Sequence, residues 1–145
     1  MSLFSMFSVS ASGMEAQRLR AQLLVENIAN SETTRTAEGG PYRRKDVSFS
    51  SQTLGELEPG SFRSRLNDAI QGVSVDSVRV DDKGPERRYQ PGHPDADAEG
   101  YVSYPNVNPA EEMVDLLSAT RSYQANVTAV AAAKDMIQRS IDLFR

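Results

Sequence analysis

The sequence has 145 residues, of which 39% are apolar and 25% are charged, and its net charge is −4. This length suffices for one domain, and the negative charge argues against nucleic acid as the main partner, because phosphate binding requires a clustered positive field. The absence of cysteine excludes disulfides, thiol nucleophiles and cysteine-ligated metals.

The chain carries no pattern typical of membrane insertion. No apolar run approaches the roughly 20 residues that a transmembrane helix needs. The first residues, Met1–Phe7, lack the basic start and long apolar stretch of a secretory signal. We therefore expect a protein that stays in the cytosol or leaves it by a route that needs no cleaved signal.

The N-terminal residues predict a long helix that begins at Leu3 or Ser8 and ends at Ala29. Its contact row advances by gaps of three and four, which is typical of a helix that packs along another helix. The row consists of Phe4, Phe7, Ala11, Met14, Arg18, Ala21, Val25 and Ile28. Gly13 costs about 1 kcal/mol relative to alanine, yet its small neighbours would let a second helix approach closely. The alternative is a frayed start and a helix that begins near Ser12.

The middle of the chain is polar and rich in glycine and proline, which predicts a linker followed by a small β-rich domain. We expect an extended linker over residues 31–40, a strand over Tyr42–Phe49 and a loop over residues 51–60. A weaker helical pattern follows and carries Phe62, Leu66, Ala69 and Ile70. The clearest strand is Gly72–Asp81, and a slip in its alternation between Val75 and Val78 indicates a bulge.

Two further expectations concern the segment before the last helix. Glu86–Gln90 is expected to pair with the strand Gly72–Asp81 as a hairpin. Residues 91–109 hold too many prolines and glycines for a regular element, so we expect an ordered loop there. Its packing residues are Tyr101, Val102, Tyr104 and Val107.

A second long helix is expected over residues 109–145. Asn108 is its predicted cap, Pro109 occupies the first helical position, and Glu111 can complete a capping box. Its contact row, again with strict gaps of three and four, consists of Met113, Leu116, Thr120, Tyr123, Val127, Val130, Lys134, Ile137, Ile141 and Phe144. At 1.5 Å per residue this helix would be roughly 54 Å long. A helix of that length must pack on other helices, either the N-terminal one or those of other subunits.

These elements predict an α+β fold in three parts. Residues 1–30 and 109–145 are expected to form two helices packed as an antiparallel coiled coil, and residues 31–108 a linker and a small β domain. The polar members of the rows, Arg18, Thr120 and Lys134, are expected to fix register. The alternative is an ordinary amphipathic helix bundle, which rarely keeps this spacing over so many turns.

Residues that carry chemistry are scarce. His93 is the only histidine, so a Ser-His-Asp triad or a two-histidine metal site cannot form within one chain, and we expect a structural or exposed role for it. Asp95, Asp97 and Glu99 resemble the opening of a calcium loop, but the twelfth position is Asn106 rather than glutamate. We interpret these acids as a solvated turn, and expect no enzyme, cofactor or metal site.

Two basic runs leave an alternative open. Arg43–Lys45 and Arg87–Arg88 would form a basic patch for an acidic partner if they lay on neighbouring strands. They would equally serve as charges that protect a strand edge.

Several stretches of the chain resemble the bacterial flagellar rod and hook proteins, a family of axial proteins. The stretch Asn27–Thr33 resembles rod and hook proteins in general. Six more specific stretches resemble a subunit of the proximal rod in particular. They are Ala11–Gln17, Gly40–Arg43, Tyr89–Asp97, Gly100–Val107, Glu112–Val114 and Ala119–Val127. The likeness covers nearly the whole chain except about residues 51–71, which are longer and more polar than the family pattern.

The resemblance implies a non-enzymatic subunit of the flagellar basal body. Such a subunit would be exported unfolded without a cleaved signal and would polymerise in the periplasm through its terminal helices, with the middle domain facing outward. It would then transmit torque. Implied partners are further copies of itself, the rod subunits FlgB, FlgF and FlgG, the adaptor FliE and the membrane ring protein FliF. The alternatives are another rod subunit, or a secreted coiled-coil adaptor unrelated to flagella.

Overall fold

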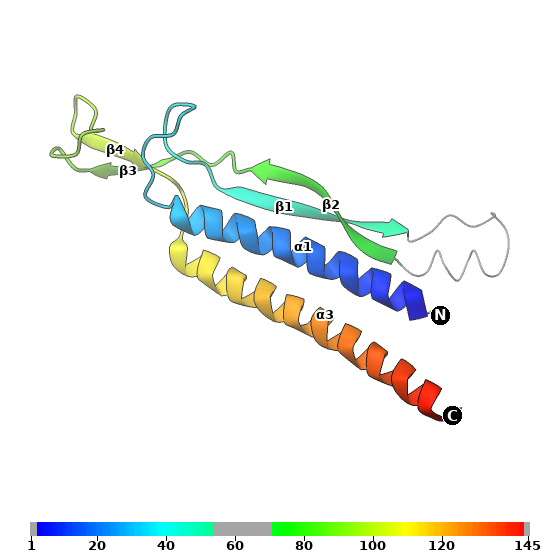
Figure 1. The fold of residues 1–145 in the computed structure, drawn as a ribbon. Helices are drawn as coiled ribbons and strands as arrows, with labels where there is room; N and C mark the ends of the chain where they lie inside the picture. The colour runs from blue at the N-terminus through cyan, green and yellow to red at the C-terminus, as the bar shows by residue number, and fades with distance from the viewer. Residues whose placement is uncertain (1–2, 54–70, 144–145) are drawn as a thin grey trace.

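The protein is elongated, with a β-sheet, a helix and a second helix stacked side by side (Figure 1). The computed structural model describes residues 3–53 and 71–143. The elements in chain order are α1 (Leu3–Ala29), β1 (Lys45–Thr53), β2 (Gln71–Val80), β3 (Glu86–Tyr89), β4 (Tyr101–Tyr104) and α3 (Pro109–Leu143). The two helices run antiparallel, and both chain ends lie at the same end of the pair. The predicted α+β fold is confirmed.

Helix α1 lies between the sheet and α3 and contacts both. It runs without a break from Leu3 to Ala29, so the long helix is confirmed and the later start near Ser12 is wrong. Its buried residues are Ala16, Leu23, Leu24 and Asn27. At its end, the Asn30 side-chain amide donates a hydrogen bond of 2.9 Å to the Glu26 carbonyl, which satisfies one of the terminal carbonyls.

At Gly13 a side chain of α3 lies close to the backbone of α1. A Cβ atom placed on Gly13 would lie 3.1 Å from Nδ2 of Asn126 and 3.3 Å from its Oδ1. The expected close approach of a second helix at this glycine is therefore confirmed.

The segment after α1 is a closed loop rather than the extended linker that we expected. The Tyr42 amide donates to the Thr33 carbonyl over 3.0 Å, and the Thr36 amide donates to the Gly40 carbonyl over 2.9 Å. Gly40 has a φ of +81°, a backbone conformation that glycine adopts at little cost. The paired glycines therefore turn the chain back toward α1, where polar composition alone had suggested a flexible path.

Strands β1 and β2 form an antiparallel sheet on α1. Both were predicted within a few residues of their bounds. The register shifts where Ser48 pairs with Ser77 but Phe49 pairs with Val75. Asp76 is thus the extra residue of a bulge, as the slip in the alternation predicted.

The predicted hairpin between Gly72–Asp81 and Glu86–Gln90 is wrong. β3 pairs with β4 in a sheet of its own, with Arg88 opposite Val102. The turn residues of the segment 91–100 serve the connection between these strands: the Gln90 amide donates to the Gly100 carbonyl over 2.9 Å. The expectation of no regular element in 91–109 is therefore wrong as well. The packing expectation is right in part, since Val102 and Tyr104 are buried.

Helix α3 begins as predicted. The Asn108 side-chain oxygen accepts a hydrogen bond of 3.1 Å from the Ala110 amide, and Pro109 is the first helical residue. The helix is described over 35 residues, to Leu143, which corresponds to about 52 Å. Phe144 and the expected short helix at Phe62–Ile70 lie outside the described residues. Neither described helix is long and apolar enough to cross a membrane.

Candidate functional site

The predicted contact row of α1 is divided lengthwise in the structure. Every second member is partly buried within the subunit, namely Phe7, Met14, Ala21 and Ile28. The members between them, Ala11, Arg18 and Val25, are exposed, and 51% of Val25 is accessible. The side chain of Phe4 lies outside the described part. Since each set repeats every seven residues, the exposed set forms a straight row along the helix.

The row on α3 is also divided, although only three of its nine described members are partly buried. Leu116, Val130 and Ile137 are partly buried, whereas the other described members are exposed. The exposed members are Met113, Thr120, Tyr123, Val127, Lys134 and Ile141. The apolar ones are substantially uncovered, with 53% of Met113, 44% of Val127 and 59% of Ile141 accessible. Exposed apolar side chains gathered along a long helix are typical of interaction surfaces.

The side of α3 that packs on α1 is offset by one residue from the predicted row. Its most buried residues are Glu112, Ala119 and Ala133, each one position before a predicted member. The small alanines, like Gly13 on α1, allow the two helices to lie close together. Within the subunit, Arg18, Thr120 and Lys134 are exposed, so the polar residues buried between the helices are others.

The exposed rows of the two helices meet at one hollow. It measures about 220 Å³ and is lined by Met14, Glu15, Arg18 and Tyr123. Three of these four residues belong to the predicted rows. The hollow therefore brings predicted members of both helices to one side of the pair.

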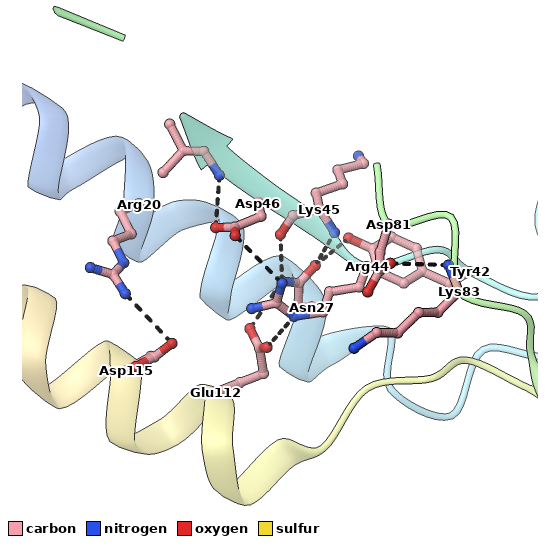
Figure 2. Close-up of polar contacts among 11 residues, drawn as sticks. Arg20, Asn27, Tyr42, Arg44, Lys45, Asp46, Asp81, Lys83, Glu112 and Asp115 are labelled. Carbon is pink, nitrogen blue, oxygen red and sulfur yellow. Dashed lines mark hydrogen bonds and ion pairs between the residues drawn. The ribbon is translucent and has the colours of Figure 1, made fainter. Parts of the chain in front are cut away.

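A buried polar cluster, here called the hub, joins α1, α3 and the sheet (Figure 2). Its centre is Asn27, which has 0% exposure. The Asn27 amide donates to the Lys45 carbonyl over 2.8 Å and to Oε2 of Glu112 over 3.0 Å. Its oxygen accepts from the Tyr42 hydroxyl over 2.9 Å and from the Lys45 amide over 3.0 Å. All four hydrogen-bonding positions of this side chain are therefore used.

Glu112 extends the hub into the first turn of α3. Only 3% of the residue is exposed, and its Oε1 accepts a hydrogen bond of 2.6 Å from Nε of Arg44. Arg44 also lies 3.7 Å from Asp46. A buried carboxylate requires such partners, because an unpaired charge in the interior is strongly destabilising.

The hub changes the acidity of two of its members. Burial raises the pKa of Tyr42 to about 12, and the negative charges of Glu26 and Glu112 act in the same direction. Burial disfavours the charged form of Arg44, but its hydrogen bond to Glu112 and the negative charges of Glu112, Asp46 and Asp81 together outweigh this and raise the pKa of the guanidinium. Both shifts favour the protonated forms of Tyr42 and Arg44, and these are the forms that donate the hydrogen bonds to Asn27 and Glu112.

The three side chains of the basic run Arg43–Lys45 pair with acidic residues of the same chain. Arg44 pairs with Glu112, Lys45 pairs with Glu26, and Arg43 pairs with Asp82. The second run, Arg87–Arg88, belongs to a different sheet. The basic patch on neighbouring strands is therefore wrong. The hub was not predicted from the sequence, in which Asn27 was noted only within the stretch Asn27–Thr33.

The carboxylate of Asp97, in the acidic turn before β4, binds groups of the same hairpin. Oδ1 of Asp97 accepts from the amides of Glu99 and Tyr101 over 3.0 and 2.8 Å, and its Oδ2 accepts from Arg87 over 2.6 Å. His93 accepts a hydrogen bond from the Asp95 amide over 3.1 Å. Among residues 3–53 and 71–143, no group of three or more histidine and acidic side chains is arranged to hold a metal ion.

Comparison with known proteins identifies relatives along the full length of the chain. A family model described as "Flagellar basal body rod FlgEFG protein C-terminal" matches residues 98–143, which comprise β4 and α3. The flagellar basal-body rod protein FlgC of Borreliella burgdorferi is 41% identical over 151 residues, covering 100% of this chain and 99% of the relative. FlgC of Bacillus subtilis is 46% identical over 150 residues, covering 99% of each chain. FlgC of Salmonella typhimurium is 38% identical over 144 residues, covering 99% of this chain and 98% of the relative.

Proposed function

Since the chain belongs to the FlgC family of flagellar basal-body rod proteins, we propose that it is a structural subunit of the proximal rod that assembles through the exposed rows of α1 and α3. The observation that carries this proposal is the divided row on each helix. On each helix some members of the row are partly buried within the subunit, and the others, including Val25, Val127 and Ile141, are left to solvent.

The energetics favour burial of these rows in an assembly. Each fully buried valine, isoleucine or methionine side chain is worth roughly 1.5–3 kcal/mol, and the exposed rows repeat such residues along α3. Part of this gain is offset by the loss of side-chain freedom on assembly. A helix pair that leaves these side chains uncovered gains stability whenever a neighbouring helix covers them.

The proposal assigns separate roles to the three parts of the chain. Residues 1–30 and 109–145 form the inner core of the rod, and residues 31–108 face outward. Neighbouring copies, the rod subunits FlgB, FlgF and FlgG, the adaptor FliE and the membrane ring protein FliF are the proposed partners. Torque passes from the ring to the distal rod and hook through these contacts, and the protein acts as a scaffold without catalysis.

The proposal places the assembled protein in the periplasm after export without a cleaved signal. N-terminal analysis of the subunit from isolated basal bodies tests this point. The expected product retains the start of α1, since Ala11 belongs to the exposed row of that helix. Loss of this segment from assembled rods would contradict the proposal.

A charge placed in the exposed row of α3 tests the assembly surface. Val127→Asp is expected to abolish incorporation into basal bodies and motility, because burying an unpaired carboxylate is strongly unfavourable. Ala132→Asp is the matched control, since Ala132 is an exposed residue of α3 outside the row. Motile cells with normal rods in the Val127→Asp strain, or equal loss in both strains, would show that the row is not the assembly surface.

The partners are accessible to site-specific cross-linking, because the natural chain contains no cysteine. Val25→Cys and Val127→Cys each place one thiol in a proposed row, and Glu38→Cys places one in the exposed loop after α1. Cross-linking of basal bodies followed by mass spectrometry is expected to join the two row positions to other rod subunits. Cross-links from Glu38→Cys alone would refute the proposed surfaces.

A further inference from the structure

The contacts between α1 and α3 repeat every seven residues, so most of them do not distinguish one register from another. On α3 the side facing α1 carries Glu112, Ala119, Asn126 and Ala133 at heptad spacing. A shift of α3 by one heptad, about 10.5 Å, would place an alanine against Gly13 instead of Asn126. Small side chains fit equally well at either position.

The connection between the helices does not remove this ambiguity. It runs from Asn30 to Asn108, and its strands β1 and β2 pack on α1 rather than on α3. Arg20 and Asp115 form an ion pair between the helices, at 3.5 Å, with both side chains substantially exposed. Exposed pairs of this kind contribute little. The hub is the contact between the helices that is both buried and unique in its chemistry.

We propose that Asn27 and Glu112 are positioning residues that set the axial register of α1 against α3, and thereby align the exposed rows on which assembly depends. A shifted register would separate the two side chains by about 10 Å. Asn27 would then lose a hydrogen bond, and the Glu112 carboxylate would lose both Asn27 and Arg44. A single buried asparagine sets register in coiled coils by the same principle.

Pairs of introduced cysteines measure the register in the full-length protein. Gly13→Cys with Asn126→Cys reports the native register, because the two positions face each other closely. Gly13→Cys with Ala119→Cys or with Ala133→Cys reports a shift of one heptad in either direction. With the natural hub, only the native pair is expected to form a disulfide under mild oxidation. Failure of the native pair to form would overturn the proposal.

The decisive variant is Asn27→Leu with Glu112→Met, which removes the polar contact but keeps side-chain volume. The ratio of shifted to native disulfide is expected to rise at least about tenfold, since that change corresponds to one net hydrogen bond. Asp115→Asn, which breaks the exposed pair with Arg20, is the control and is expected to leave the ratio unchanged. An unchanged ratio in the helical double variant would refute the proposal.

A second variant keeps the test decisive if the double variant loses its helical circular dichroism. Asn27→Asp places a second carboxylate beside Glu112, and the repulsion is expected to favour the shifted disulfides. Exclusive formation of the native disulfide in this variant would also refute the proposal.

The inference rests in part on the proposed function, and the two can fail separately. Cysteine pairs report register in the purified chain, without any rod. A shifted register in a strain that still builds normal rods would contradict the assembly rows and leave the register role intact. Loss of rods with an unchanged register would contradict the register role and leave the rows intact.

Discussion

The side-chain amide of Asn27, near the end of α1, donates a hydrogen bond of 3.0 Å to the carboxylate of Glu112, in the first turn of α3. Both residues are buried. The same asparagine binds both backbone groups of Lys45, where β1 begins. One side chain thus connects three elements that are far apart in the sequence, as Figure 2 shows.

Removal of the Glu112 carboxylate is expected to destabilise the protein by about 2–4 kcal/mol. Glu112→Ala leaves Arg44 and the Asn27 amide without their partner in a largely buried setting, and broken buried pairs cost several kcal/mol. Urea unfolding followed by circular dichroism measures the change. Asp115→Ala, which removes the solvent-accessible ion pair with Arg20, is the control and is expected to cost less than about 1 kcal/mol. Equal losses in the two variants would contradict the role of the hub.

Tyr42 is expected to make stability fall at alkaline pH. Its pKa is about 12 in the folded protein and 10.0 ordinarily. Between these values the unfolded chain has released the phenolic proton and the folded chain has not, so stability declines as pH rises, by about 3 kcal/mol in all. Tyr42→Phe removes this decline and costs about 1 kcal/mol at neutral pH, because the bond to Asn27 is lost.

The comparison of unfolding free energies from pH 9 to pH 12 tests this prediction. Tyr123→Phe removes a hydroxyl from an exposed position on α3 and is expected to keep the decline of the natural protein. A curve for Tyr42→Phe that falls as steeply as that of the natural protein would contradict the assignment.

The elements of this fold that sequence alone predicts are those set by local chemistry. Asn108 followed by Pro109 marks the start of α3, and the slip between Val75 and Val78 marks the bulge in β2. The spacing of the helix rows predicted that each helix packs along another. Local spacing did not reveal which members of each row are buried within the subunit and which are exposed, because a spacing of 3.5 residues is the same for both sets.

The features that sequence reasoning missed depend on contacts between distant segments. β2 pairs with β1 across a long connection instead of forming the local hairpin with β3, since strand pairing is decided by the surface on which the sheet packs. The residues next to Arg44 and Glu112 in the sequence do not distinguish these two from charged residues on the surface. Asn27 precedes a predicted row position, and a buried role for it becomes visible only when Tyr42, Lys45 and Glu112 are brought together.

Gly13 is expected to show coupling with Asn126. Gly13→Ala improves helix propensity by about 1 kcal/mol, but the new methyl group would meet Asn126 at 3.1 Å. The two effects oppose each other, so the single variant is expected to be nearly neutral. In an Asn126→Ala background the same change is expected to stabilise by about 1 kcal/mol. A double-mutant cycle by urea unfolding measures the coupling, and the full gain in the natural background would contradict the close packing at Gly13.

Asp97 is expected to titrate below its ordinary pKa of 3.8. The hydrogen bond from the Tyr101 amide is the main cause, and the bond from Arg87 adds to it. Because the folded pKa is depressed, the contribution of Asp97 to the β3–β4 hairpin is present above the ordinary value and is lost as pH falls through the depressed one. The amide resonance of Tyr101, followed by NMR from pH 6 to pH 2, is expected to report this titration.

Two variants separate the charge of Asp97 from its role as an acceptor. Asp97→Asn keeps an oxygen for the amides of Glu99 and Tyr101 but has no carboxyl group to ionise. The pH-dependent change of the Tyr101 amide resonance is therefore expected to disappear while the hairpin persists. Asp97→Ala removes the acceptor, and faster hydrogen exchange at Tyr101 is expected because its amide loses its partner. A titration that persists in Asp97→Asn would assign the shift to another acid, with Asp95→Asn as the next variant to compare.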